Sequence, residues 1–463
     1  MQKNTVDIIT LGCSKNLVDS EKLLRQFAAA GFTVHHDREN IGGEIVVVNT
    51  CGFINDAKEE SINAILGLIE LKKRRKIGKL FVMGCLSERY KKELEQELPE
   101  VDKFYGKFDW GKIIEELNFT QSERKVINEP FASFAKTPLR SLRETAPRVT
   151  PPHFSYIKIS EGCDRTCSYC AIPLMTGKHV SRKMEDILQE ISHLAKNGTK
   201  EFQLIAQDLT YYGLDIYRKN KLAELVEKIA QTNGVEWVRL HYGYPQNFPL
   251  DLLKVIRDNN NVCNYLDMAL QHISDNMLQK MHRNISKSET YDLIAKIRSE
   301  VPDIHLRTTL LLGHPHETLD DVEELKDFIK EMRFERLGAF AYSHEEGTFS
   351  YKNYKDIIPL EEKNRRVGEI MEIQQKVSTE INEKKIGKVL KTIIDRKENE
   401  FFIGRTEFDS PEIDGEVLIA STCLRLRSGT ALSNCELKIG EFYDVKITGA
   451  QEFDLEGEVL SFF

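Results

Sequence analysis

Short apolar segments alternate with helical segments over the first 120 residues, and this alternation constrains the fold more than any other feature of the sequence. Three segments rich in valine and isoleucine are predicted as buried strands: Val6–Leu11, Glu44–Asn49 and Lys79–Met83. The helical patterns that follow them are Ser20–Ala30, Ala57–Lys73 and Glu88–Leu98. A βαβαβ order predicts a parallel sheet with right-handed crossovers.

The middle third of the chain repeats this alternation. Its six strand candidates are Phe154–Ile159, Glu201–Ala206, Trp237–Leu240, Leu266–Leu270, Leu306–Leu312 and Leu337–Tyr342, and each but the last precedes a helical pattern. Eight βα units would close a barrel. Six therefore predict an open (β/α)6 partial barrel, whose gap could admit a bulky substrate.

Changes in composition set the expected domain boundaries. Five of the thirteen prolines fall within residues 119–152, which predicts a linker. From residue 388 onward, short alternating segments separated by Gly, Asp and Ser predict a small antiparallel β-barrel. We expect an α/β fold class, with a parallel-sheet domain at 1–120, a linker at 121–148, the partial barrel at 149–379 and the β-barrel at 380–463.

Hydrophobicity and cysteine content indicate the cellular setting. No apolar run is long enough to span a bilayer, and the N-terminus leads directly into a strand, so we expect no signal peptide, no membrane partner and a cytoplasmic location. In such a reducing compartment, clustered cysteines among the nine indicate metal binding or catalysis more than disulfides.

Three cysteines form a CxxxCxxC pattern directly after the first predicted barrel strand. They are Cys163, Cys167 and Cys170, in the stretch EGCDRTCSYCAIP. The loop at the C-terminal end of a barrel strand is where this architecture places active sites. Three thiolates cannot complete tetrahedral zinc without a fourth ligand, but they can hold three irons of a 4Fe-4S cluster and leave the fourth iron open. A zinc knuckle that borrows a distant histidine is the alternative.

This motif resembles that of the radical S-adenosylmethionine (SAM) enzymes. The resemblance implies that the three cysteines are catalytic and that the open iron binds SAM through its amine and carboxylate. One electron then cleaves SAM to give a 5′-deoxyadenosyl radical. In that family the residue before the third cysteine is aromatic and lies near the adenine, and Tyr169 fits this position.

Four other polar residues stand at or near the ends of predicted barrel strands. They are Gln207, Asp208, Gln271 and Arg307. Because barrel-strand ends form the active site of this architecture, we expect these side chains to contact SAM or the substrate. Internal hydrogen bonding is the alternative role for each.

A second set of cysteines follows the three N-terminal strands, one cysteine per strand. Cys13 ends TLGC, Cys51 follows VVVNT and Cys85 follows FVMG. The carboxyl ends of neighbouring parallel strands share one edge, where ligands bind. The three cysteines are therefore predicted to converge on a metal site, again a three-thiolate 4Fe-4S cluster with one open iron.

The combination of both cysteine sets with a C-terminal β-barrel resembles the methylthiotransferase family over essentially the whole chain. The resemblance implies that the last part is a substrate-binding TRAM domain. It implies two SAM molecules, one as methyl donor and one as radical source, and two 4Fe-4S clusters. It also implies an electron donor such as flavodoxin or ferredoxin, and a sulfur donor, neither of which the sequence identifies.

Within this family, LGCSKNLVDSE (Leu11–Glu21) looks like the RimO branch, which modifies the β-carbon of an aspartate in a ribosomal protein of the small subunit. The tRNA-modifying MiaB branch more typically carries Gln-Met-Asn after this first cysteine. Further RimO-like stretches are LIAQDLTYYG, YLDMALQHIS, YSHEEGT and DSPEIDG. Two departures lie near the expected SAM pocket: Thr176 stands where the family usually has Arg, and His314 and His316 stand where it often has Phe and Gly.

Charge gives an independent indication of the substrate. Residues 380–463 contain 11 Lys plus Arg and 17 Asp plus Glu, a net charge of −6, and the whole chain carries −8. An acidic β-barrel would repel tRNA, whose recognition depends on neutralising phosphates, and would attract a basic ribosomal protein. A tRNA adenosine is the less favoured substrate, and a non-enzymatic zinc or iron–sulfur module on the ribosome is the alternative from another functional class.

Overall fold

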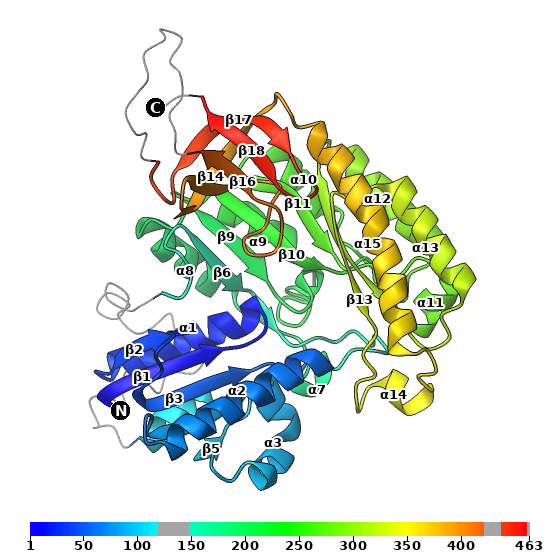
Figure 1. The fold of residues 1–463 in the computed structure, drawn as a ribbon. Coiled ribbons are helices and arrows are strands. Elements are labelled where there is room, and N and C mark those ends of the chain that lie inside the picture. Colours follow the sequence, from blue (N-terminus) through cyan, green and yellow to red (C-terminus); the bar gives the residue numbers. More distant parts are fainter. Residues whose placement is uncertain (118–147, 421–436, 461–463) are drawn as a thin grey trace.

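The computed structural model describes residues 1–117, 148–420 and 437–460, and these form three parts (Figure 1). The N-terminal part lies against one end of a central open barrel, and a C-terminal barrel lies against the other end. This arrangement confirms the predicted α/β class. The predicted linker, residues 121–148, lies outside the described residues except for its last residue.

The N-terminal part is a five-stranded parallel sheet in the order β2-β1-β3-β4-β5. Its strands are β1 (Gln2–Thr10), β2 (Thr33–His36), β3 (Gly43–Thr50), β4 (Lys79–Gly84) and β5 (Lys103–Phe104). The three predicted strands are its centre. The two edge strands, β2 and β5, were not predicted, because β2 is polar and β5 has only two residues.

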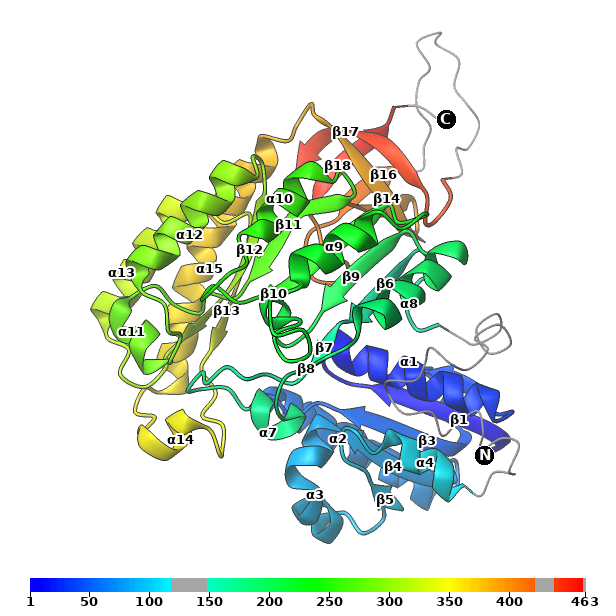
Figure 2. The same ribbon diagram turned by 180° about the vertical axis from the view of Figure 1, so that it is seen from behind.

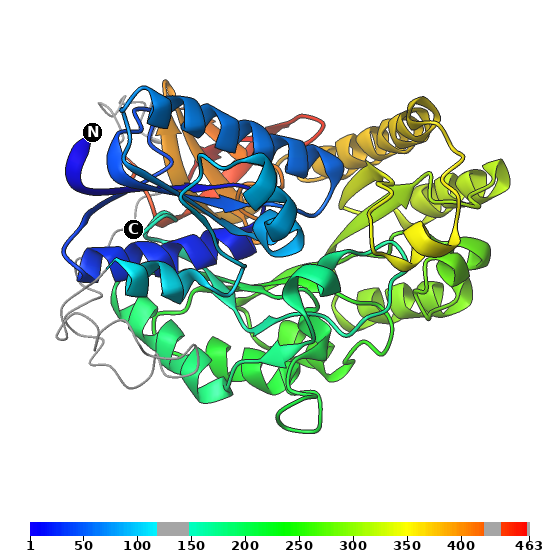
Figure 3. The same cartoon turned by 90° about the horizontal axis from the view of Figure 1, so that it is seen from below.

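Helices cover both faces of this sheet, so its strands are buried on both sides. They are α1 (Ser14–Ala29), α2 (Asn55–Lys73), α3 (Cys85–Glu97) and α4 (Trp110–Glu116). One apolar core joins α1 and α4 to Val6, Ile45 and Phe81 of the sheet, and a second core joins α2 and α3 to the opposite face. Figure 3 shows the two helical layers on opposite sides of the blue strands.

The central part is a six-stranded parallel sheet in the order β13-β12-β11-β10-β9-β6. Its strands are β6 (Phe154–Lys158), β9 (Glu201–Ile205), β10 (Trp237–Gly243), β11 (Val262–Met268), β12 (His305–Leu312) and β13 (Arg336–Ala341). These are the six predicted strands. Among the described residues the edge strands β6 and β13 do not pair, so the barrel is open.

Helices cover the outside of this open barrel, as Figure 2 shows from behind. They are α8 (Met184–Lys196), η1 (Leu209–Tyr211), α9 (Leu222–Ala230), α10 (Asp251–Asp258), α11 (Asp275–Lys280), α12 (Lys287–Glu300), α13 (Leu319–Met332) and α15 (Leu360–Glu383). Capping boxes at Ser286/Glu289 and Thr318/Asp321 start α12 and α13 by satisfying otherwise unpaired backbone N–H groups. Two short helices, α7 (Ile172–Thr176) and α14 (Phe349–Asn353), and the ribbon β7 (Ser160–Glu161) and β8 (Val180–Ser181) lie towards the N-terminal part.

The C-terminal part is a closed five-stranded barrel. Its strands are β14 (Val389–Glu398), β15 (Phe401–Thr406), β16 (Val417–Ala420), β17 (Phe442–Ala450) and β18 (Leu455–Val459). The small β-barrel is confirmed, with one pair that differs from the antiparallel expectation. Strand β18 lies between β17 and β16 and runs parallel to β16.

Buried ion pairs join the C-terminal barrel to the central strands. Glu201 of β9 accepts hydrogen bonds from Arg405 of β15 at 2.8 Å and from Arg239 of β10 at 3.0 Å, and these three side chains are at most 2% exposed. Breaking a buried pair leaves an uncompensated charge, at a cost of about 3–5 kcal/mol. These pairs therefore fix the barrel against the strands. No helix in the described part of the chain has the length and apolar character needed to cross a membrane.

Candidate functional site

The three N-terminal cysteines lie at the carboxyl ends of the adjacent strands β1, β3 and β4. Cys13 is the N-cap of α1, which begins at Ser14 rather than at the predicted Ser20, and Cys85 is the first residue of α3. Helix N-termini favour negative charge, including a thiolate. The sequence prediction that these cysteines share one sheet edge agrees with the strand order.

Gly12 and Asn16 hold this edge together. Gly12 has φ +92°, and a Cβ placed on it would lie 2.8 Å from the Cβ of Cys51, so the β1 turn and Cys51 are in close contact. The buried Asn16 amide donates to the carbonyls of Leu11 at 2.9 Å and Thr50 at 3.2 Å, and its oxygen lies 3.8 Å from the Cys85 sulfur. The first turn of α1 thus ties together the ends of all three strands.

The thiols of this site lie within electrostatic range of one another. Burial raises the pKa of Cys85 to about 12, and the neighbouring Cys13 and Cys51 add to this shift. Burial also raises the pKa of Cys51, and Cys13 contributes. Such thiols bind metal only as thiolates, so occupation of the site would release protons. In the described part of the chain, no three His, Cys, Asp or Glu side chains are grouped so that they could hold one metal ion. A 4Fe-4S cluster does not require such a group, because it binds each thiolate to a different iron.

The CxxxCxxC loop follows β6 and β7 in the central part. Gly162 has φ +80°, and a Cβ there would overlap the carbonyl of Lys178, so the loop needs glycine directly before Cys163. Backbone N–H groups of Cys163 and Cys170 donate to the carbonyls of Gly177 and Cys167, each at 3.1 Å. These hydrogen bonds fix the backbone of the loop at its first and third cysteines.

A cation and a hydroxyl group lie beside the Cys167 sulfur of this loop. Arg283, which is 2% exposed, has its Nη1 3.3 Å from the Cys167 sulfur and 3.2 Å from the Tyr169 hydroxyl. The Tyr244 hydroxyl lies 3.6 Å from the same sulfur. Burial raises the pKa of Cys163 to about 12 and also raises that of Cys170. Donors aimed at cysteine sulfurs suit thiolates that hold an iron–sulfur cluster.

The predicted SAM-contacting residues fall into two places. Tyr169 is on the cysteine loop and lies edge-to-face to His314. Asp208 accepts from Arg165 of the cysteine loop at 2.7 Å, and Gln207 next to it donates to Glu161. These side chains lie around the loop at the carboxyl ends of β6 and β9.

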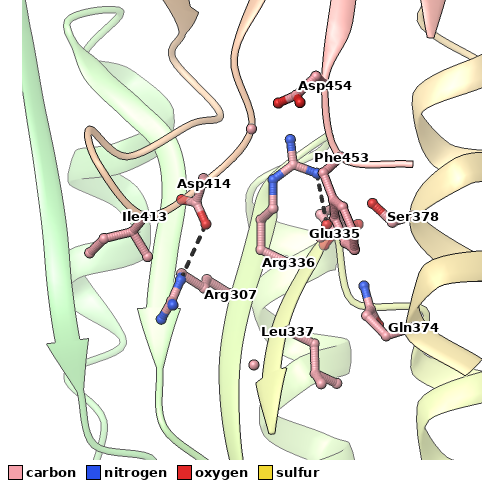
Figure 4. A pocket seen from close by; sticks show the side chains of 12 residues that line it. Arg307, Glu335, Arg336, Leu337, Gln374, Ser378, Ile413, Asp414, Phe453 and Asp454 are labelled. Atoms are coloured by element: carbon pink, nitrogen blue, oxygen red, sulfur yellow. Dashed lines mark hydrogen bonds and ion pairs between the residues drawn. The ribbon is translucent and has the colours of Figure 1, made fainter. Parts of the chain in front are cut away.

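Gln271 and Arg307 have different surroundings. Gln271 has φ +73°, and its backbone bridges to β12 through Thr309 and Leu311. Arg307 stands near the start of β12, with its guanidinium 3.2 Å from Asp414 and 3.4 Å from Asp267. Figure 4 shows its contact with Asp414, and both residues line a cavity of about 230 Å³ between β12, β13, α15 and the C-terminal part. Arg307 thus pairs with Asp267 of β11 and with Asp414 of the C-terminal part, and among the described residues none of its ion pairs is with the cysteine loop.

The two cysteine sites adjoin each other. Cys85 packs in one apolar cluster with Ala171 and Met175, which directly follow the CxxxCxxC motif. Figures 1 and 2 show α7, which carries Met175, beside the N-terminal part. Buried ion pairs also cross this boundary: Lys158 to Asp19 at 2.7 Å, and Lys107 to Glu161 at 3.4 Å.

Sequence reasoning missed several residues of the site, chiefly Lys107, Glu161, Arg165, Tyr244 and Arg283. A signal existed for Glu161 and Arg165, which flank the cysteine motif closely. Lys107, Tyr244 and Arg283 come from loops remote in sequence, and a single arginine or tyrosine on a loop carries no pattern.

Comparison with known proteins agrees with the three structural parts. Residues 5–106 match the uncharacterized protein family UPF0004, residues 157–329 match the radical SAM superfamily, and residues 386–460 match the TRAM domain. Relatives match the whole chain. The chain is 57% identical to the ribosomal protein uS12 methylthiotransferase RimO of Phocaeicola vulgatus, over 99% of this chain and 100% of that protein. The chain belongs to the RimO methylthiotransferase family.

The similarity to this family extends to other members. The RimO proteins of Porphyromonas gingivalis and Cytophaga hutchinsonii are 56% and 48% identical over 99% of this chain, with 100% and 98% of their own lengths covered. The chain is a radical SAM methylthiotransferase. The prediction of its enzyme class is therefore confirmed.

Solved structures share the fold at low identity. Two structures of the radical S-adenosylmethionine methyltransferase TsrM from Kitasatospora setae match with TM-scores of 0.50 and 0.53, at 16% and 14% identity. Each match covers 73% of this chain, and 75% and 72% of the respective TsrM chains. This similarity supports the fold.

Proposed function

We propose that this enzyme transfers a methylthio group to the β-carbon of an aspartate in ribosomal protein uS12. The observation that carries the proposal is the adjacency of two three-cysteine sites, Cys13/Cys51/Cys85 and Cys163/Cys167/Cys170, in a member of the RimO family. Its relatives, which match over the whole chain, are ribosomal protein uS12 methylthiotransferases, and this supports uS12 as the substrate. The aspartate and its β-carbon come from the family resemblance of the sequence motifs.

We also propose the cofactors and assign each of them to a defined set of residues. Each cysteine set holds one 4Fe-4S cluster, and SAM binds beside Tyr169, Gln207 and Asp208. When bound, the reduced cluster and SAM supply a carbon radical able to take hydrogen from an unactivated C–H bond, which acid–base chemistry cannot do. Zinc bound by the same thiols is the competing assignment, and iron and sulfide analysis decides it: about eight irons per chain support two clusters.

The chain's own residues orient and shield these groups. Arg283 donates hydrogen bonds to the Cys167 sulfur and to the Tyr169 hydroxyl, so it fixes the aromatic ring relative to the Cys167 thiolate. The guanidinium carbon of Arg165 lies 4.0 Å from the ring centroid of Tyr244, and Arg165 also pairs with Asp208, so this residue links the cysteine loop to the ends of β9 and β10. The apolar contact of Cys85 with Ala171 and Met175 keeps the two sulfur sites close.

The exposed charge of the C-terminal barrel supports a basic protein substrate over tRNA. Several acidic residues, among them Asp395, Asp409 and Asp414, are paired internally with arginines or histidine and contribute little outward. The exposed residues of the described barrel still include more acidic than basic side chains. We further propose domain divisions near residues 120, 148 and 379, a cytoplasmic location, and separate sulfur and electron donors.

The test is a direct comparison of substrates. Reconstituted enzyme is incubated with SAM and reductant and with either uS12 or bulk tRNA, and both products are weighed by mass spectrometry. A methylthio mass gain on a uS12 aspartate is expected. A gain on tRNA alone would overturn the substrate, and zinc without release of 5′-deoxyadenosine would overturn the assignment of the metal sites.

A further inference from the structure

Lys107 is a buried cation between the two cysteine sites. It lies in the turn between β5 and α4 and is 3% exposed. Its Nζ is 3.7 Å from the Cys85 sulfur and 3.4 Å from a carboxylate oxygen of Glu161, on the opposite side of the boundary between the two parts. Burying an ammonium group costs several kcal/mol unless it is paired, so the Glu161 carboxylate, and a thiolate at Cys85, would stabilise Lys107 in this position.

Glu161 links Lys107 to the SAM-binding side of the molecule. The oxygen that faces Lys107 also accepts a hydrogen bond from Gln207, at the end of β9. Its other oxygen accepts from Lys158 at 2.7 Å, and Lys158 in turn pairs with Asp19 of α1 at 2.7 Å. A continuous buried network therefore runs from Cys85 to Gln207.

The charges of this network sum to zero when Cys85 is a neutral thiol. Lys107 and Lys158 offset Asp19 and Glu161, and a thiolate at Cys85 adds one negative charge beside Lys107. A positive charge and a hydrogen bond at a cysteine sulfur favour the reduced, more negative state of an iron–sulfur cluster. In a buried site this effect is weakly screened.

We infer that Lys107 is a positioning residue that raises the reduction potential of the group held by Cys13, Cys51 and Cys85. Through Glu161, Lys107 also connects Cys85 to Gln207 on the other side of the boundary. This inference rests on the proposed N-terminal cluster.

The experiment uses the full-length chain with Cys163, Cys167 and Cys170 all replaced by alanine, so that only the N-terminal cluster can form. Its potential is measured by anaerobic redox titration followed by electron paramagnetic resonance. Lys107→Met is expected to shift the midpoint to a more negative potential, and Lys107→Arg to restore it. Lys92→Met, which removes an exposed lysine of α3 in the same part of the chain, is the matched control and should leave it unchanged.

A second variant is expected to shift the midpoint potential in the opposite direction. Glu161→Gln removes a negative charge from the same network and should shift the midpoint to a less negative potential, so it tests the inference even where Lys107→Met fails to hold iron. Normal iron content with no shift in Lys107→Met, or no shift in Glu161→Gln, would overturn the inference. A parent chain that binds no iron, instead of about four atoms for one cluster, would overturn the proposed cluster itself.

Discussion

At the scale of single residues, the N-terminal site depends on the space left by Gly12. This glycine lets the chain turn between β1 and α1 against the side chain of Cys51. Asn16 then connects the ends of the strands through buried hydrogen bonds. One small and one polar residue thus place three cysteines that are far apart in sequence.

Gly12→Ala should therefore abolish the N-terminal site. Its Cβ would lie 2.8 Å and 2.9 Å from Cβ and Sγ of Cys51, so Cys51 must move. Iron content of the reconstituted protein should fall by about half, since one of two clusters is lost. Gly31→Ala is the matched control, because Gly31 has φ +85° but open space around it. It carries the same backbone strain, about 1 kcal/mol, and should keep full iron content; equal loss in both variants would refute the steric account.

At the scale of elements, the C-terminal barrel is fixed to the central strands by buried charges rather than by an apolar seam alone. Arg405 of β15 and Arg239 of β10 meet at Glu201, and Arg336 of β13 pairs with Asp409. The DSPEIDG stretch is one of the stretches that resemble the RimO branch. It supplies Asp409 and Asp414 to these contacts. Its role in this structure is to join the barrel to β12 and β13.

Glu201→Gln should destabilise the protein strongly, because it leaves two guanidinium groups buried with less negative charge. We expect a loss of about 3 kcal/mol or more in the free energy of unfolding, measured by urea denaturation. Glu398→Gln breaks an exposed pair with Arg396, whose side chains are 56% and 42% exposed, and should cost less than about 1 kcal/mol. Similar losses in the two variants would show that burial does not govern these pairs.

At the scale of the whole molecule, we expect net charge to affect encounter with the proposed substrate more than it affects the fold. The chain carries a formal charge of −8, and −6 of this falls within residues 380–463. Long-range attraction of opposite charges accelerates association and is screened by salt.

The association rate with uS12 should therefore fall as salt rises, by roughly tenfold between about 50 mM and about 500 mM. Stopped-flow fluorescence of labelled uS12 measures this rate. A rate independent of salt would argue against electrostatic attraction, and faster association with tRNA than with uS12 at low salt would reverse the preference.

Much of this architecture could be predicted from the sequence, because periodic patterns report burial. Val/Ile runs indicated the three central N-terminal strands, and short apolar segments alternating with helical patterns indicated the six barrel strands. The cysteines that follow strands predicted the two cysteine sites. The edge strands β2 and β5 lack such a pattern. Residues that contact the cysteines, such as Lys107 and Arg283, reach them only through tertiary packing. The ion pair of Arg307 with Asp414 likewise joins segments far apart in sequence, so no local pattern indicates it.

The most direct test of the account separates the two cysteine sites in one variant. Cys13→Ala removes a ligand of the N-terminal site and leaves Cys163, Cys167 and Cys170 intact. Release of 5′-deoxyadenosine from SAM and the mass of uS12 are measured in the same reaction. The account predicts that SAM cleavage persists while methylthio transfer is lost. Normal methylthio transfer by Cys13→Ala would contradict it.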